Sequence, residues 1–193
     1  GGALSESVII ILGLSNLVAD GLSMAAANFA GTRAELDNRA RLRAIEQRHI
    51  RLAPEGERAE IREIYREKGF TGDDLERAVD VITADRERWI ATMLSEEYGL
   101  ADAPPHAWGA ALSTFIAFVL CGFVPIAPFV FGVPHPLLLS VVLTVVTFFA
   151  VGAGKSAWSM RSPLLNGLET LAIGTGAAAA AYAIGHGARQ LLG

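Results

Sequence analysis

Two groups of side chains in this 193-residue chain have the chemistry and the spacing to hold a cation. The first group lies in the apolar stretch from Val8 to Gly31, where polar or thioether residues recur at every fourth position. Its members are Asn16, Asp20, Met24 and Asn28. Residues four apart share one face of a helix, so their oxygen and sulfur donors would form a stripe. The stripe fits a cation route, and it fits equally a hydrogen-bonded seam between membrane helices.

The second group lies between residues 32 and 100 and combines carboxylates with one imidazole and one thioether. Its members are Glu46, His49, Glu57, Glu60, Met93 and Glu97. The first four form two pairs at i, i+3 spacing, which helical bundles use to hold iron or manganese. A divalent cation would offset several carboxylates that are turned toward a packed interior. On spacing alone, however, ordinary surface pairing with the many nearby arginines is the simpler interpretation.

Four apolar runs would position these groups. The first, from Val8 to Gly31, would be about 36 Å long as a helix, enough to cross a bilayer core of about 30 Å. The others are Trp108–Val133, Leu137–Gly154 and Leu164–His186. Asp20 lies near the middle of the first run, where a carboxylate costs at least about 2.5 kcal/mol unless it faces a bundle interior or a water path. The pattern predicts four transmembrane helices.

Charge is concentrated in the segment between the first two runs. Of the 16 Lys and Arg, 13 lie between residues 33 and 106, as do 17 of the 20 Asp and Glu. The mean hydropathy of +0.39 is high for a soluble protein. We therefore predict an all-α membrane protein with a transmembrane helix at 1–31, a polar insert at 32–106 and three further transmembrane helices at 107–193. The insert mixes both signs of charge, which gives no indication of nucleic-acid binding.

The insert is predicted to be helical throughout. Residues 32–52 continue the first membrane helix, and Pro54 suits the first turn of a second helix that ends at Gly69. Thr71, with an acid three residues on, predicts a capping box for the third helix. Asp85 or Thr83 would cap a fourth helix that ends near residue 99.

Helical periodicity also predicts which faces are packed. In the first insert helix the predicted face is Leu42, Ile45, His49 and Leu52, with Glu46 at its border. In the second it is Glu57, Glu60, Ile61 and Ile64. In the last it is Trp89, Ile90, Met93 and Glu97.

Topology follows from the basic residues. Lys155 and Arg161 lie between the third and fourth apolar runs, two crossings away from the charged insert. Both loops therefore fall on the same side of the membrane, and the positive-inside rule makes that side cytoplasmic. We expect a multi-pass protein of the cytoplasmic (inner) membrane, with the insert in the cytoplasm.

Three strings, taken in order along the chain, resemble the vacuolar iron transporter family, which includes bacterial members. They are DGLSMAAANFAGTRAELD, PEGERAEIREIYREKGF and FVPIAPFVF, and the last membrane run, GLETLAIGTGAAAAAYAIG, continues the likeness. The resemblance implies a homodimer with five membrane helices per subunit and a cytoplasmic helical metal-binding domain. It also implies that the family's first helix is not in this sequence, because the residues before Val8 resemble its tail.

The resemblance implies a function and its residues. The family moves Fe²⁺ or related divalent metals out of the cytosol with proton exchange, and we expect Fe²⁺ or Mn²⁺ transport, no enzymatic activity and no organic cofactor. The family's acidic pairs fall on Glu46 with His49 and on Glu57 with Glu60, and its last-helix ligands fall on Met93 and Glu97. Its membrane-path methionine matches Met24. These are the residues that helical spacing selects, and the agreement favours a metal site over surface pairing.

Two departures from the family pattern affect this prediction. His49 stands where the family more often has Glu, and imidazole also accepts Zn²⁺, Co²⁺ and Ni²⁺. Asn28 replaces another Glu, as in a bacterial branch. Two other functions remain open: a membrane-anchored di-iron oxidase of ferritin-like type, for which only one of the two usual Glu-x-x-His motifs is present, and a membrane scaffold that binds no metal.

Overall fold

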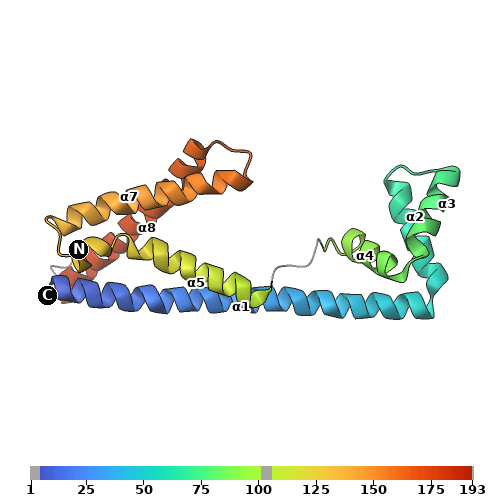
Figure 1. Cartoon of the computed structure of the whole chain (residues 1–193), viewed down its shortest axis with the longest axis horizontal. Coiled ribbons are helices and arrows are strands. Elements are labelled where there is room, and N and C mark those ends of the chain that lie inside the picture. Colours follow the sequence, from blue (N-terminus) through green and yellow to red (C-terminus); the bar gives the residue numbers. More distant parts are fainter. Residues whose placement is uncertain (1–4, 101–105, 193) are drawn as a thin grey trace. The chain divides into compact units, whose positions relative to one another are not determined.

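The computed structural model describes residues 5–100 and 106–192, and all regular structure within these ranges is helical (Figure 1). The helices are α1 (Glu6–Leu52), α2 (Pro54–Glu67), α3 (Gly72–Thr83), α4 (Arg86–Glu96), α5 (Ala107–Phe123), α6 (Ala127–Val130), α7 (Pro136–Gly154), η1 (Lys155–Trp158) and α8 (Pro163–Leu192). The chain divides into two compact units. One contains residues up to Ala25 and from Leu112 onward, and the other runs from Ala26 to Ala111.

Three helical segments in the described part of the chain are long and apolar enough to cross a membrane: Glu6–Leu52, Pro136–Trp158 and Pro163–Leu191. The predicted second run differs from this pattern. Its first part forms α5, an apolar helix of 17 residues. A turn around Pro125 follows, and the short α6 comes after it. Proline removes a backbone donor and disfavours a continuous helix, which explains the interruption.

Helices α7 and α8 run side by side (Figure 1). Glycines allow their close approach. A Cβ at Gly152 would lie 2.4 Å from the Asn166 carbonyl oxygen and 2.6 Å from Thr170 Oγ1, and one at Gly174 would lie 2.7 Å from the ring of Phe148. Membrane helices commonly associate through small residues that permit such close backbone packing.

The second unit has its own hydrophobic core, to which the last turns of α1 and all of α2, α3 and α4 contribute. Its centre is Ile61, Val79 and Ile90, none of which is exposed. Arg62 reinforces the packing of α2 on α3 through a bidentate pair with Glu76, at 2.7 and 2.9 Å. This core holds three helices against the end of α1 and fixes the side chains that they present to one another.

The helix boundaries in this unit agree with the sequence. α1 continues to Leu52, α2 begins at Pro54, and the Asp85 side chain caps α4 by accepting a bond from the Arg88 amide at 2.8 Å. The predicted capping box at Thr71 is wrong. Thr71 occupies the N-cap position without a side-chain bond, and Gly72 has a φ of 58°, so the first turn does not present its amides as a regular helix would.

Candidate metal-binding site

The carboxylate of Glu46 lies in the interior of the second unit. Leu42, Glu46 and Ile50 are the buried residues of this part of α1, spaced four apart, and Glu46 is 0% exposed. The predicted face was therefore rotated: Glu46 is at its centre rather than at its border, and Leu52 is exposed. Leu52 is the last residue of α1, just before the chain turns into α2, so it lies beyond the packed part of the helix.

Glu57 approaches Glu46 from α2. Pro54 begins this helix, and Glu57 lies in its first turn, buried together with Ile61 one turn further on. A carboxylate in the first turn is favoured by the partial positive charge of a helix N-terminus. The chain reversal between α1 and α2 thus brings two acids, eleven positions apart in sequence, into one buried space.

His49 completes a cluster of three possible metal ligands. Its Nδ1 lies 3.4 Å from Glu57 Oε1 and 3.9 Å from Glu46 Oε1. One ligand atom from each of the three residues falls within 4.8 Å of the others. The imidazole is half exposed, whereas both carboxylates are buried. The cluster therefore has a protein-lined side and a side that opens to solvent.

Two oxygens in this cluster lack any partner within the described residues. Oε2 of Glu46 and Oε2 of Glu57 are both buried without a hydrogen bond. A buried carboxylate oxygen without a donor is unfavourable unless a cation is nearby. Oxygen ligands with one imidazole suit divalent metals of the iron and manganese type. The residues present therefore fit a divalent cation.

Electrostatics around Glu57 indicate a shortage of positive charge. The pKa of Glu57 is raised to about 7, first because the side chain is buried and then because the charges of Glu60 and Glu46 lie close to it. The pKa of Glu97 is also raised, first by partial desolvation of its carboxylate and then by the charge of Glu46. Four carboxylates from α1, α2 and the end of α4 thus interact. His49 partly offsets the shifts of Glu57 and Glu97, and a hydrogen bond from Tyr98 also lowers the pKa of Glu97.

This raised pKa predicts a pH dependence of stability for the metal-free protein. Between pH 4.5 and about pH 7 the folded chain binds more protons at Glu57 than the unfolded chain does, so stability is lost as the pH rises through this window. We expect the unfolding midpoint of the chelator-treated protein in detergent to fall between pH 5 and pH 8. The same scan with Glu57→Gln should show a smaller fall. An equal fall of the midpoint in both proteins would contradict the assignment of this pH dependence to Glu57.

The other predicted ligands lie around the cluster in different environments. Glu60 is exposed on α2, and Glu97 is exposed at the C-cap of α4. Met93 is fully buried in the core, one turn before Glu97. Sequence reasoning missed Tyr98, whose hydroxyl donates to Glu46 Oε1 at 2.9 Å. Its position directly after Glu97 was the available signal.

The predicted membrane stripe lies on α1, and each of its four members is exposed in the isolated chain. Met24 borders a mostly apolar hollow of about 560 Å³ that Phe118 and Cys121 of α5 and Thr147 of α7 also line. Asn28 accepts a hydrogen bond from Thr32 at 3.3 Å and donates to the Ala110 carbonyl at 3.4 Å. The stripe is therefore available to a partner or an ion from outside the chain.

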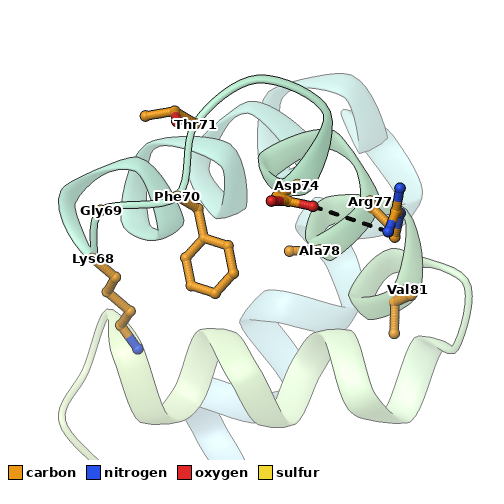
Figure 2. Close-up of a pocket in the computed structure, with 8 residues that line it drawn as sticks. All are labelled: Lys68, Gly69, Phe70, Thr71, Asp74, Arg77, Ala78 and Val81. Atoms are coloured by element: carbon orange, nitrogen blue, oxygen red, sulfur yellow. Dashed lines mark ion pairs between the residues drawn. The ribbon is translucent and has the colours of Figure 1, made fainter.

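A second hollow, of about 530 Å³, lies over the turn between α2 and α3 (Figure 2). Phe70 and Val81 contribute apolar surface to it, and Lys68 and Arg77 contribute positive charge. Asp74 is the one acid among its lining residues, and it pairs with Arg77 at 3.9 Å. This donor set does not suit a cation, in contrast to the cluster around Glu46.

Comparison with known proteins connects these features. The family model described as the VIT family matches residues 1–186. A vacuolar iron transporter 1 from Arabidopsis thaliana is 31% identical over 188 residues, which cover 95% of this chain and 75% of that protein. Proteins of the same name from Eucalyptus grandis and Oryza sativa subsp. japonica are each 30% identical to this chain. Each alignment covers 94% of this chain, and it covers 74% of the Eucalyptus protein and 73% of the Oryza protein. These relatives are named as transporters and not as enzymes. The chain belongs to the VIT family.

Proposed function

We propose that this chain transports divalent metal ions, Fe²⁺ or Mn²⁺, across a membrane. Its relatives are named vacuolar iron transporters, and the chain has both apolar helices of spanning length and a cluster suited to such a metal. The observation that carries the proposal is the pair of buried carboxylate oxygens, on Glu46 and Glu57, that have no donor. A cation bound between them satisfies both oxygens at once.

In the proposed mechanism, the second unit captures the ion. Glu46, His49 and Glu57 supply the ligand atoms that already lie together. Glu60, Met93 and Glu97 complete the set, since the charge of Glu60 acts on Glu57, and Glu97 is influenced by Glu46. The thioether of Met93 would require a shift of its side chain within the core. Because His49 is half exposed whereas Glu46 and Glu57 are buried, the imidazole is the most accessible of these three ligands to an arriving ion.

The membrane path follows the stripe on α1. Asp20 exchanges protons and Met24 contacts the moving ion, with Asn16 and Asn28 as further polar groups along the helix. An exposed carboxylate on a membrane helix favours contact with a partner helix or a water path over contact with lipid. A homodimer would provide that environment, since a second copy would bring the same stripe to the first.

We further propose the topology. Residues 1–31 and 107–193 form the membrane part, and 32–106 form the cytoplasmic metal-binding domain, of which 101–105 lie outside the described residues. α5 together with α6 would make a fourth crossing. The basic residues Lys155 and Arg161 in the short loop support a cytoplasmic position of the insert at the inner membrane, by the positive-inside rule. Metal then moves out of the cytosol in exchange for protons.

Flux measurements on the reconstituted full chain test this function. We expect Mn²⁺, followed with a fluorescent indicator inside vesicles, to enter protein-containing vesicles faster when their interior is acidic than when the two sides have equal pH. Vesicles without protein provide the background. Metal entry that does not exceed this background in either condition would refute transport. Entry above this background that does not depend on the pH gradient would refute proton exchange but not metal transport.

A further inference from the structure

Tyr98 is the residue of the metal cluster that neither helical spacing nor family likeness selects. Its hydroxyl donates to Glu46 Oε1 at 2.9 Å, although the two residues are 52 positions apart. The ring is half-buried against the core of the second unit. Glu46 therefore has two neighbours at Oε1: His49, which lies on the same helix, and Tyr98, which lies beyond the end of α4.

The backbone after α4 fixes the position of this side chain. Gly99 has a φ of 63°, in the left-handed region that glycine adopts without strain. The Leu100 amide then reaches back to the Leu94 carbonyl at 3.0 Å and closes the helix end. Tyr98 lies within the turn that this bond closes, so its backbone position is defined.

The hydrogen bond gives the two carboxylate oxygens of Glu46 different environments. Oε1 accepts from Tyr98, whereas Oε2 is buried without a partner. A carboxylate held by one oxygen cannot rotate freely about its last bond, so the other oxygen keeps a defined direction.

We propose that Tyr98 is a positioning residue for metal capture, which orients Glu46 so that Oε2 binds the ion. This inference rests on the proposed capture site. Hydrogen-bond partners of metal ligands typically contribute about 10–100-fold to metal affinity. We expect Tyr98→Phe, which removes only the hydroxyl, to weaken metal binding by about that factor without changing the fold.

Tyr65 offers a matched control. It is also half-buried against the same core, but it lies on α2 and contacts Phe70 and Lys68 instead of a carboxylate of the cluster. Removal of its hydroxyl by Tyr65→Phe changes the core by the same single atom. We expect this variant to bind metal as the wild type does.

The experiment titrates Co²⁺ into the full chain in detergent, with heat and visible absorption as the two readouts. The absorption of Co²⁺ reports its ligand geometry, which a purely structural role of Tyr98 would leave unchanged. We expect Tyr98→Phe to lower affinity and to shift this spectrum. In a Glu46→Asp variant the shorter side chain withdraws from the hydroxyl. In that background, Tyr98→Phe should cause almost no further loss of Co²⁺ affinity.

Each outcome separates this inference from the function on which it rests. If wild-type protein and Tyr98→Phe bind Co²⁺ equally, the positioning role is refuted and the capture site stands. The role is also refuted if affinity falls while the Co²⁺ spectrum is unchanged, or if the Tyr98 and Glu46 effects are fully additive. If the wild-type chain does not bind Co²⁺, the capture site itself fails.

Discussion

Glu57→Gln is expected to lower the affinity of the full chain for Mn²⁺ by at least about 100-fold, because it removes a charged ligand where even the loss of a supporting hydrogen bond costs about 10–100-fold. Gln preserves the shape of Glu57 and one of its oxygens but removes the negative charge that attracts the ion. Calorimetric titration without oxygen, repeated with Fe²⁺, measures the loss.

The same substitution should leave the metal-free fold intact or stabilise it. Burial and the neighbouring carboxylates raise the pKa of Glu57 to about 7, so its ionised form opposes folding at pH 8. We therefore expect an unfolding midpoint at least as high as that of the wild type. Loss of binding in a protein of undiminished stability cannot be attributed to misfolding.

Glu63→Gln is the matched control for this experiment. Glu63 lies on the same helix, is exposed and pairs with Arg66 instead of facing the cluster. The change removes one negative charge from α2 without touching a proposed ligand. If both variants bind Mn²⁺ like the wild type, the cluster is not a capture site. If both lose affinity equally, the insert attracts metal through its overall charge.

Local signals in the sequence predicted the helices of the insert well. Pro54 and Asp85 mark helix starts through chemistry that acts within a few residues, and both starts are confirmed. The second apolar run was predicted as one span because length and hydropathy do not register a backbone interruption. Pro125 lies within that run, and proline disfavours a continuous helix, which is consistent with the end of α5 at Phe123.

Prediction was weaker for the site because its geometry depends on long-range packing. The periodicity of α1 is compatible with several neighbouring faces. The predicted face had Glu46 at its border and Leu52 within it, whereas the structure buries Glu46 and Ile50 and exposes Leu52. The packing of α2 and α4 against α1 decides which of these faces is buried, and the sequence of α1 alone does not determine that packing. Tyr98 was missed for the same reason, since its contact with Glu46 spans 52 positions.

Asp20→Asn is expected to abolish metal flux while leaving metal capture unchanged. Asn has nearly the size of Asp and keeps one acceptor oxygen, but it neither carries a charge nor releases a proton. Replacement of a carboxylate by a neutral amide in an apolar membrane stretch also favours insertion, so the variant should reach the membrane at least as well as the wild type. Mn²⁺ entry into vesicles with an acidic interior should therefore fall to the level of protein-free vesicles, at undiminished protein content.

Asp37→Asn tests whether this loss depends on position. Asp37 is also exposed on α1, but it lies beyond the apolar stretch and pairs with Arg33 at 3.3 Å. We expect its variant to transport normally, because an exposed ion pair of this kind contributes little. Retained flux in Asp20→Asn would assign the stripe to a seam between helices. Simultaneous loss of Mn²⁺ binding would mean that capture and passage are not separate sites. The expected pattern is that Asp20→Asn loses flux but retains Mn²⁺ binding, whereas Glu57→Gln loses Mn²⁺ binding. This pattern would support a route in which the ion first binds at the cluster and then passes along α1.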